Sequence, residues 1–527
     1  MFEQFFDKRS LYVLAGLLGA HLLAALVQHH WLSVVPVAAA AIVAFGLSMK
    51  RLEWGIAFAF LEIFVGGHGH LFDLSSVGVP VSVRIAIFLG VMAAFVVRVA
   101  TKQSTLSWNN RRDVPWVVFG LAVVLGGLVG FLQNARGNAF DDFNSYLPVL
   151  YVLPLISIHW DNAKKRLMLM TLAVSAVWVA STTLLMLFGF THLPGKFLSH
   201  LYTFVRDARL AEITILTAPE SLAGLFPTGA WYFRIFQQSQ IVLFAFLYVL
   251  AAGFYSAEKV DRRVLALFVL LFAGMYASLS RTFAIAAVPA TFVFFGLMFA
   301  SKVPLKTIAI RSVMIGVTKM ATVLLLWLTV VFPLPIRPDF TASPFYKGGE
   351  GAERDLAVSS RWNLLPPMMT EIWKSPIVGS GFGKEVTFIS DDPRVRAING
   401  TGEWTTYRFE WGYQDIWLKT GVLGLVGILL IAASYAIATQ SHLRKGHDDK
   451  WVVIGMFSST VFLLIVHVFT PYLNHPLGLS LLLFPLVFLA FEDPKLKTTE
   501  ALSRPMVRGG QTLGQAAAST AILSETL

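Results

Sequence analysis

Repeated apolar runs constrain this chain more than any other feature of its sequence. Most are about 18–23 residues long, and a helix needs roughly 20 apolar residues to cross the hydrocarbon core of a bilayer. A membrane β-barrel would instead show short segments of alternating polarity, which the sequence lacks. We therefore predict an all-α polytopic membrane protein with about 14 transmembrane helices. The runs cover residues 11–28, 32–49, 53–66, 81–99, 114–132, 144–159, 167–189, 240–256, 264–279, 282–301, 312–333, 412–438, 451–470 and 474–491.

Composition and charge fit the same class of protein. Hydrophobic residues make up 56% of the 527 residues and charged residues only 14%, against about 25% charged residues in a soluble domain. The net charge of +11 would suggest nucleic acid in a soluble protein, but here Lys and Arg gather in every second connection between apolar runs. Positively charged connections stay in the cytoplasm. We therefore expect cytoplasmic termini, no nucleic-acid partner, and two long connections that face outward.

This topology divides the chain into six predicted regions. In the first long connection, apolar residues of the segment 194–216 recur near helical spacing, which predicts an amphipathic helix on the outer interface; a plain soluble helix is the alternative. The chain has no cysteine, which excludes disulfides and thiolate metal sites. The regions are N-terminal transmembrane helices (1–189), a periplasmic loop with the interfacial helix (190–239), transmembrane helices (240–333), a large periplasmic loop (334–411), C-terminal transmembrane helices (412–491) and a disordered cytoplasmic tail (492–527).

Three arginines lie at the predicted outer boundary of the membrane, where a charge is costly and calls for a functional explanation. Arg234 lies where the first long loop enters the membrane, Arg281 between two apolar runs, and Arg361 early in the second long loop. A guanidinium stays charged and grips phosphate oxygens with paired hydrogen bonds. Three converging arginines would suit a pyrophosphate-linked lipid. The alternative is that each arginine pairs with a carboxylate or a lipid headgroup.

Carboxylates at the end of the second long loop are candidates for a general base. Glu410 lies at the edge of the following span, where a partly desolvated carboxylate can take up a proton. Asp415, further into the span, is the competing candidate. The alternative for Glu410 is an ion pair with Arg408 or another nearby arginine. In the N-terminal half, Glu62 and Arg84 lie in neighbouring spans, and we expect them to pair in a structural role.

No pattern in the sequence predicts a metal or a nucleotide. An Asp-x-Asp triplet is missing, and His68 and His70 have no third ligand nearby. The segment SPIVGSGFGKE (375–385) lacks a preceding strand and the spacing of a dinucleotide fingerprint. We interpret its glycines as residues that let the loop pack tightly against the membrane face. The expected catalysis therefore uses arginines and a base, with no metal and no cofactor.

Three segments follow one another around the second long loop: Ser280–Arg281–Thr282; then Arg361 with Trp373, Pro376 and the glycines 379–383; then EWGYQDIWLKTGVLG at 410–424. Together they resemble the O-antigen ligase and polymerase family of bacterial glycosyltransferases, over roughly residues 220–491. Ligases of that family usually carry His-Asn where this chain has Glu410 and Trp411. The run from Glu410 to Tyr413 is closer to the acidic run of some exopolysaccharide polymerases.

The resemblance implies glycosyl transfer at the outer face of the bacterial inner membrane, from an undecaprenyl-pyrophosphate-linked glycan to an acceptor glycan or glycolipid. Membrane lipids and other polysaccharide-assembly proteins are the implied partners. An exopolysaccharide or O-antigen polymerase is favoured over a ligase acting on lipid A core. A transporter or flippase of the same lipids, and a structural scaffold, are the alternatives from other classes. The implied roles are general base for Glu410, pyrophosphate neutralisation for Arg234, Arg281 and Arg361, and substrate binding also for Arg408 and Asp415.

Overall fold

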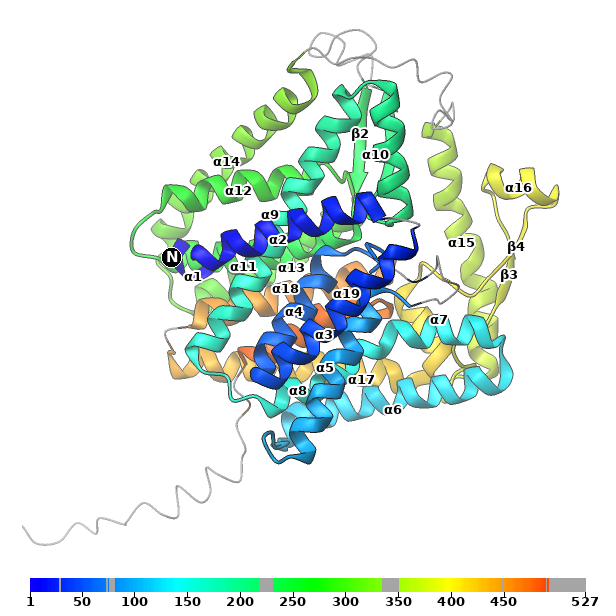
Figure 1. Ribbon diagram of the computed structural model, residues 1–527, viewed down its shortest axis with the longest axis horizontal. Helices are drawn as coiled ribbons and strands as arrows, with labels where there is room; N and C mark the ends of the chain where they lie inside the picture. The colour runs from blue at the N-terminus through cyan, green and yellow to red at the C-terminus, as the bar shows by residue number, and fades with distance from the viewer. Residues whose placement is uncertain are drawn as a thin grey trace, which may run out of the picture.

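The computed structural model describes residues 1–27, 30–72, 74, 81–217, 231–333, 350–447, 449–489 and 491. Within these residues, ten helices are long and apolar enough to cross a membrane, which confirms an all-α polytopic membrane protein (Figure 1). They are α2 (Lys8–Val27), η1 with α3 (Trp31–Ser33 and Val34–Lys50), α5 (Val83–Ala100), α6 (Asn110–Gln133), α9 (Asn162–His192), η5 with α11 (Gln238–Gln240 and Ile241–Ser256), α13 (Arg281–Ala300), α14 (Leu305–Val331), α17 (Gly412–Lys445) and α18 (Lys450–Phe469).

The other four predicted runs also form helices, but these helices are shorter. The longest of them has 15 residues and would extend only about 22 Å, which is less than the roughly 30 Å of a bilayer core. All fourteen apolar runs of the sequence therefore correspond to helical segments. Ten of these segments are long enough to be candidate spans. The four are α4 (Leu52–Val65), η3 with α8 (Leu147–Tyr151 and Val152–Ser157), α12 (Arg262–Tyr276), and α19 with η8 (Pro476–Leu483 and Phe484–Val487).

The centre of the bundle is formed by α11 and α18, which pack against each other. A helix that is hydrophobic on all sides has no face suited to water, so it belongs inside the bundle. Nearly every side chain of α11 is buried, and Phe244 stacks on Phe462 of α18 with ring centroids 4.4 Å apart. By contrast, α2, α13 and α14 expose apolar side chains such as Phe292, as helices that face lipid do.

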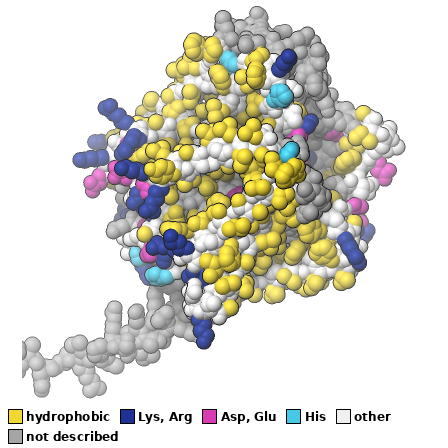
Figure 2. Space-filling model, viewed as in Figure 1, with side chains coloured by type: hydrophobic (Ala, Val, Ile, Leu, Met, Phe, Trp, Pro, Cys, Tyr) yellow, Lys and Arg dark blue, Asp and Glu magenta, His cyan; other side chains and the backbone are white. Residues whose placement is uncertain are grey.

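The helices have two chemically different ends. At one end α13 and α17 begin and α6, α9 and α18 finish; we call it the hairpin end because it carries both β-hairpins. At the other, the basic end, α12 and α14 begin and α17 finishes in Arg444 and Lys445. Figure 2 shows Lys and Arg side chains gathered along the left side, near the N-terminus, and hydrophobic side chains across the middle. This distribution agrees with the predicted alternation of basic connections.

The hairpin end carries the elements that surround the candidate site. A first antiparallel hairpin pairs β1 (Glu212–Thr217) with β2 (Trp231–Phe236), with Thr214 opposite Arg234. A second pairs β3 (Val386–Ile389) with β4 (Glu403–Thr406), and it lies with α15 on the right of Figure 1. The helices here are α7 (Arg136–Tyr146), α10 (Gly195–Asp207), α15 (Glu350–Lys374), α16 (Pro393–Asn399) and η7 (Tyr472–Asn474), while α1 (Phe2–Phe5) lies at the N-terminus.

The predicted interfacial helix is only partly correct. The helix α10 ends at Asp207, and the rest of the predicted segment turns back as β1. Arg209 adopts a φ of 50°, which ends the helical path, and the β-branched residues that follow in β1 favour a strand. On its apolar side α10 buries Leu198 and Val205 in a cluster with Phe233 of β2. The predicted disordered tail, 492–527, lies outside the described residues.

Candidate active site at the hairpin end

The turn between α12 and α13 carries Arg281. Just before it, Leu279 has a φ of 44°, a strained conformation for a leucine of the kind that gathers at functional sites. Ser280 then caps α13, because its hydroxyl accepts a hydrogen bond from the Phe283 amide at 3.4 Å. Arg281 is therefore the first residue of a 20-residue helix. Its positive charge adds to the positive end of the helix dipole at the N-terminus of α13, a combination that favours an anion.

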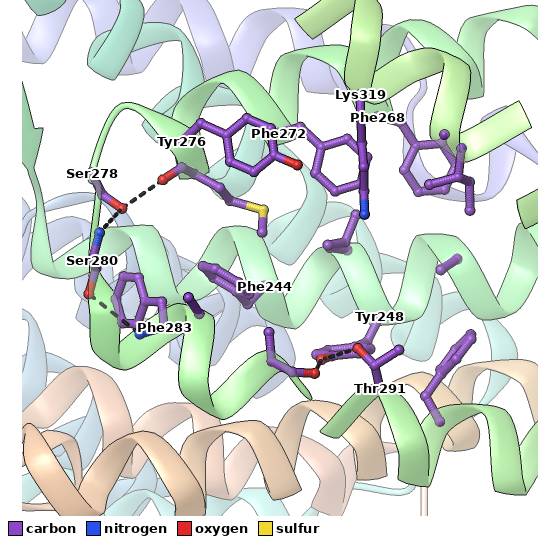
Figure 3. Close-up of a pocket in the computed structure, with 18 of the residues that line it drawn as sticks. Phe244, Tyr248, Phe268, Phe272, Tyr276, Ser278, Ser280, Phe283, Thr291 and Lys319 are labelled. Carbon is purple, nitrogen blue, oxygen red and sulfur yellow. Dashed lines mark hydrogen bonds between the residues drawn. The ribbon is translucent and has the colours of Figure 1, made fainter. Parts of the chain in front are cut away.

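A mostly apolar cavity of about 660 Å³ lies between α11, α12, α13 and α14, and Arg281 is among the residues that line it. Figure 3 shows aromatic side chains from α11, α12 and α13 facing the cavity. The hydroxyl of Tyr248 forms a hydrogen bond of 3.2 Å with the hydroxyl of Thr291, so this polar group has its partner within the cavity wall. The second charged group in the wall is the ammonium of Lys319, 5.3 Å from the ring centroid of Phe272. Such a cavity can hold a hydrocarbon chain whose anionic end lies at Arg281.

The strand β2 brings Arg234 to the same turn. Its Nε donates a hydrogen bond to the carbonyl of Ser278 at 2.8 Å, and its guanidinium carbon lies 5.0 Å from the ring centroid of Phe236. The next amide along the strand, that of Ile235, donates to the Ala277 carbonyl at 3.1 Å. Two hydrogen bonds from β2 therefore hold the turn that precedes Arg281, and the two arginines are neighbours across this turn.

An ion pair joins Arg361 of α15 to Glu410, just before α17. Both side chains are about half exposed. The indole Nε1 of Trp411 donates to the backbone carbonyl of Arg361 at 2.8 Å, which fixes α15 against the start of α17. Partial burial lowers the pKa of Arg361, and the carboxylate of Glu212 opposes this shift. Because Glu212 lies on β1, next to the strand that carries Arg234, the β1–β2 hairpin adjoins both groups of arginines.

Arg408 turns toward α7. Its guanidinium forms an ion pair with Asp141 at 3.2 Å, and the hydroxyl of the preceding Tyr407 donates to the same carboxylate at 3.0 Å. The ion pair that was the alternative to a general-base role for Glu410 is therefore present, with Arg361 and not Arg408 as its partner.

Asp415 belongs to a buried ion network. The ammonium of Lys419 lies 2.8 Å from Asp415 and 2.9 Å from Asp142 of α7, and it also donates to the carbonyl of Tyr407 at 2.8 Å. Asn474 of η7 donates a further hydrogen bond to Asp415. The Lys419 side chain is only 3% exposed, so its charge is balanced by the two carboxylates instead of by water. The network ties α7, α17 and η7 together and holds the chain just before α17.

The glycine-rich loop 379–383 packs against three helices. A Cβ on Gly381 would lie 2.7 Å from the Cα of Gly130 in α6, and one on Gly379 would lie 2.5 Å from the backbone nitrogen of Gly421 in α17. Both glycines have positive φ, 79° and 84°, and so does Gly421, where α17 departs from helical geometry. The predicted tight packing is confirmed, and α6, α7 and α17 form the surface that receives the loop. The loop thereby fixes the end of α15 relative to the start of α17.

The expected pairing of Glu62 with Arg84 is confirmed. Two hydrogen bonds of 3.0 and 3.2 Å join the side chains, and Arg84 also donates to the carbonyl of Gly67 at 2.8 Å. The next residue, His68, contacts the ring of His475 with centroids 5.1 Å apart. Burial, with the nearby Arg84 charge, lowers the pKa of His68 to about 4. Within the described residues, no three His, Asp or Glu side chains are grouped closely enough to hold a metal ion.

The predicted site residues thus lie in two neighbouring groups and in a layer of ion-paired side chains that supports them. Arg234 bonds to the turn that precedes Arg281, and Arg361 pairs with Glu410 before α17. The remaining two predicted residues pair with side chains of α7 and α17 in the supporting layer.

Sequence reasoning missed the residues that hold this arrangement. Lys419 carried a usable signal, because it follows Asp415 by four residues inside an apolar run, the spacing at which helical side chains pair. The buried amide of Gln240 carried none. It donates to the carbonyls of Ile235 and Gly274 at 3.0 and 3.1 Å, which joins β2 to the end of α12.

Comparison with known proteins gives an independent observation. A family model described as O-antigen ligase matches residues 266–429. This segment runs from α12 into α17 and contains Arg281, Arg361, Glu410 and the glycine-rich loop. The match supports the resemblance to the O-antigen ligase and polymerase family. No curated protein sequence and no solved structure matches the chain.

Proposed function

Since residues 266–429 match the O-antigen ligase family, we propose that this protein is an inverting, metal-independent glycosyltransferase at the outer face of the bacterial inner membrane. Its donor is a glycan linked to undecaprenyl pyrophosphate, and it extends an exopolysaccharide or O-antigen chain. One observation supports the proposal most directly: Arg281 is the first residue of α13 and also lines a cavity between helices.

A polyprenyl diphosphate has two chemically distinct parts, and the site suits both. The hydrocarbon tail fits the apolar cavity between α11, α12, α13 and α14. The diphosphate fits Arg281 and the amides at the start of α13, since a helix N-terminus and a guanidinium both favour phosphate oxygens. Arg234, held on the Ser278 carbonyl, adds a second positive charge beside the same turn.

The chemical step uses the second group of residues. An acceptor hydroxyl attacks the anomeric carbon of the donor, the bond from that carbon to the diphosphate oxygen breaks, and its electron pair leaves with the diphosphate. Glu410 takes the proton of the hydroxyl. Arg361 orients the Glu410 carboxylate through its Nε, and its remaining N–H donors can reach the departing diphosphate. Negative charge on the leaving group grows in the transition state, so arginine contacts there accelerate transfer.

A ligase that transfers the glycan to lipid A core is the second candidate, and the description of the matched family favours it. The acidic residue at Glu410, where ligases of the family usually carry His-Asn, favours the polymerase. The two differ in product size, because a ligase adds one glycan to each acceptor whereas a polymerase makes a ladder.

The test uses the purified full-length protein in lipid nanodiscs, with lipid-linked glycan extracted from producing cells and no ion gradient. Arg281→Ala and Glu410→Gln should each slow transfer by about 30- to 1,000-fold, the equivalent of about 2–4 kcal/mol. Arg396→Ala is the control, since this exposed arginine of α16 pairs with Asp391 away from the turn before α13. Polymer of normal length and amount from Arg281→Ala would refute the proposal. A wild-type protein that moves lipid across vesicles but transfers no sugar would be a transporter.

A further inference from the structure

Two tryptophans border the Arg361–Glu410 ion pair. Trp362 follows Arg361 in α15, Trp411 follows Glu410, and their ring centroids lie 4.8 Å apart at an interplanar angle of 67°. Trp411 is only 7% exposed and its Nε1 is bonded to the Arg361 carbonyl, so its ring is fixed. Trp362 is 56% exposed. The fixed Trp411 ring therefore holds the Trp362 ring edge-on. Much of the Trp362 ring stays exposed beside the half-exposed Arg361 and Glu410 side chains.

A membrane-interface role accounts for a second pair better than for this one. Further along α15, Trp373 lies edge-on against Trp417, with centroids 5.6 Å apart, and Trp417 belongs to the candidate span α17. Tryptophans are enriched where spans meet the headgroups. Trp362 lies eleven residues before Trp373, about 16 Å away along the helix axis. The half-exposed ion pair next to it indicates water at this position, and α15 is not among the candidate spans of the described residues.

We propose that the open face of Trp362 is the sugar-stacking surface of an acceptor subsite. This inference rests on the proposed function and adds the place where the acceptor binds. A pyranose ring has an apolar face of C–H groups and a rim of hydroxyls. The C–H face matches an indole, whose ring face carries negative charge density and attracts positively polarised hydrogens. The hydroxyl rim matches the neighbouring Arg361 and Glu410, which can donate to and accept from hydroxyls.

The same electrostatics separate acceptor from donor. The negative face of an indole repels a diphosphate, so the charged part of the donor favours the Arg281 and Arg234 turn. A sugar stacked on Trp362 carries no such charge, and its rim lies next to Glu410. The proposed general base therefore lies beside the stacking surface, paired with Arg361.

The test compares Trp362→Ala with Trp373→Ala, a control in the same helix that is similarly exposed, at 64%, and also lies edge-on against a tryptophan of the α17 region. The probe is the oligosaccharide released from extracted lipid-linked glycan by mild acid, used as a soluble acceptor at saturating donor. Trp362→Ala should raise the acceptor KM about tenfold, the upper range for an aromatic contact. It should change kcat and the donor KM less than about twofold, and Trp362→Phe should restore most of the loss. Trp373→Ala should keep the wild-type acceptor KM.

Calorimetric binding of the same oligosaccharide, which needs no turnover, separates this inference from the proposed function. A wild-type protein that binds the oligosaccharide but transfers nothing leaves the subsite standing while the transferase assignment fails. The subsite is overturned when Trp362→Ala binds as tightly as wild type, when it matches Trp373→Ala in acceptor KM, or when the wild-type protein does not bind the oligosaccharide.

Discussion

Gly381→Ala tests whether the glycine-rich loop fixes the site. This residue has a φ of 79°, and a Cβ added to it would lie 2.7 Å from the Cα of Gly130 in α6. Gly400 provides a matched control, since it has a φ of 72° and nothing within 4 Å of an added Cβ. Both alanines suffer the same backbone penalty, so the difference between the variants isolates the close approach of the loop to α6.

The magnitudes follow from the contacts. Gly400→Ala should cost about 1–2 kcal/mol, the penalty of a left-handed conformation for an L-residue. Gly381→Ala adds a clash with backbone atoms that cannot rotate away, so the loop must lift from α6. Lifting it breaks the hydrogen bond from the Phe382 amide to the Gly126 carbonyl, 2.9 Å, and two bonds from Asn134, 2.8 and 2.9 Å. Three such bonds at about 0.5–1.5 kcal/mol each give about 1.5–4.5 kcal/mol more.

The assay is thermal unfolding of both variants in the same detergent, with glycan transfer measured on the folded fraction. Gly381→Ala should unfold well below Gly400→Ala and lose transfer activity, because a lifted loop frees the end of α15 from α17. Gly400→Ala should retain activity close to wild type. Equal unfolding midpoints and equal transfer activities for the two variants would refute the conclusion that the glycine-rich loop packs against α6 because its glycines have no side chain.

Two further predictions concern buried charge. Lys419→Met leaves two buried carboxylates without their cation and should destabilise the protein by about 3–5 kcal/mol; a denaturation midpoint like that of wild type would contradict the network. His68 has a pKa lowered to about 4, so between about pH 6.5 and 4 the unfolded chain binds more protons than the folded protein. Stability should therefore fall as the pH drops through this window, by up to about 1.4 kcal/mol per pH unit. His68→Gln should flatten this part of the pH profile of the unfolding midpoint, and an unchanged profile would exclude His68 as its source.

Local properties of the sequence were enough for the helical architecture. The length and hydrophobicity of an apolar run indicate whether that segment can enter a bilayer. The fold class therefore followed from the positions of the runs along the sequence. The runs 53–66 and 264–279 also match α4 and α12 to within three residues at each end, although these helices are too short to be candidate spans. The β1–β2 hairpin was also missed. Its first strand, β1, begins within the segment 194–216, whose apolar residues fit helical spacing, and only the pairing of β1 with β2 distinguishes a strand from a helix there.

The site was predictable residue by residue but not as pairs. A charged residue at a membrane boundary is conspicuous in sequence, which is how Arg281 and Glu410 were identified. Partners far apart along the chain leave no such trace. Arg361 meets Glu410 across 49 residues, and Arg408 meets Asp141 across 267. These pairings depend on how α15 and α7 approach α17, which is set by backbone contacts of the glycine-rich loop.

Hydrogen bonds that do not use the guanidinium groups fix the backbone at Arg281 and Arg361. Arg281 is placed by the Ser280 cap and by the hydrogen bond from Ile235 to the turn, and Arg361 is placed by Trp411, which bonds to its carbonyl. None of these bonds uses a guanidinium. Removing the charge of Arg361 breaks a half-exposed ion pair, which costs little stability, and leaves the bond from Trp411 in place, so this change should act mainly on transfer. A change in the glycine-rich loop should affect both stability and transfer. Because the bonds that position the arginine do not involve its guanidinium, the role of the charge in transfer can be tested without unfolding the protein.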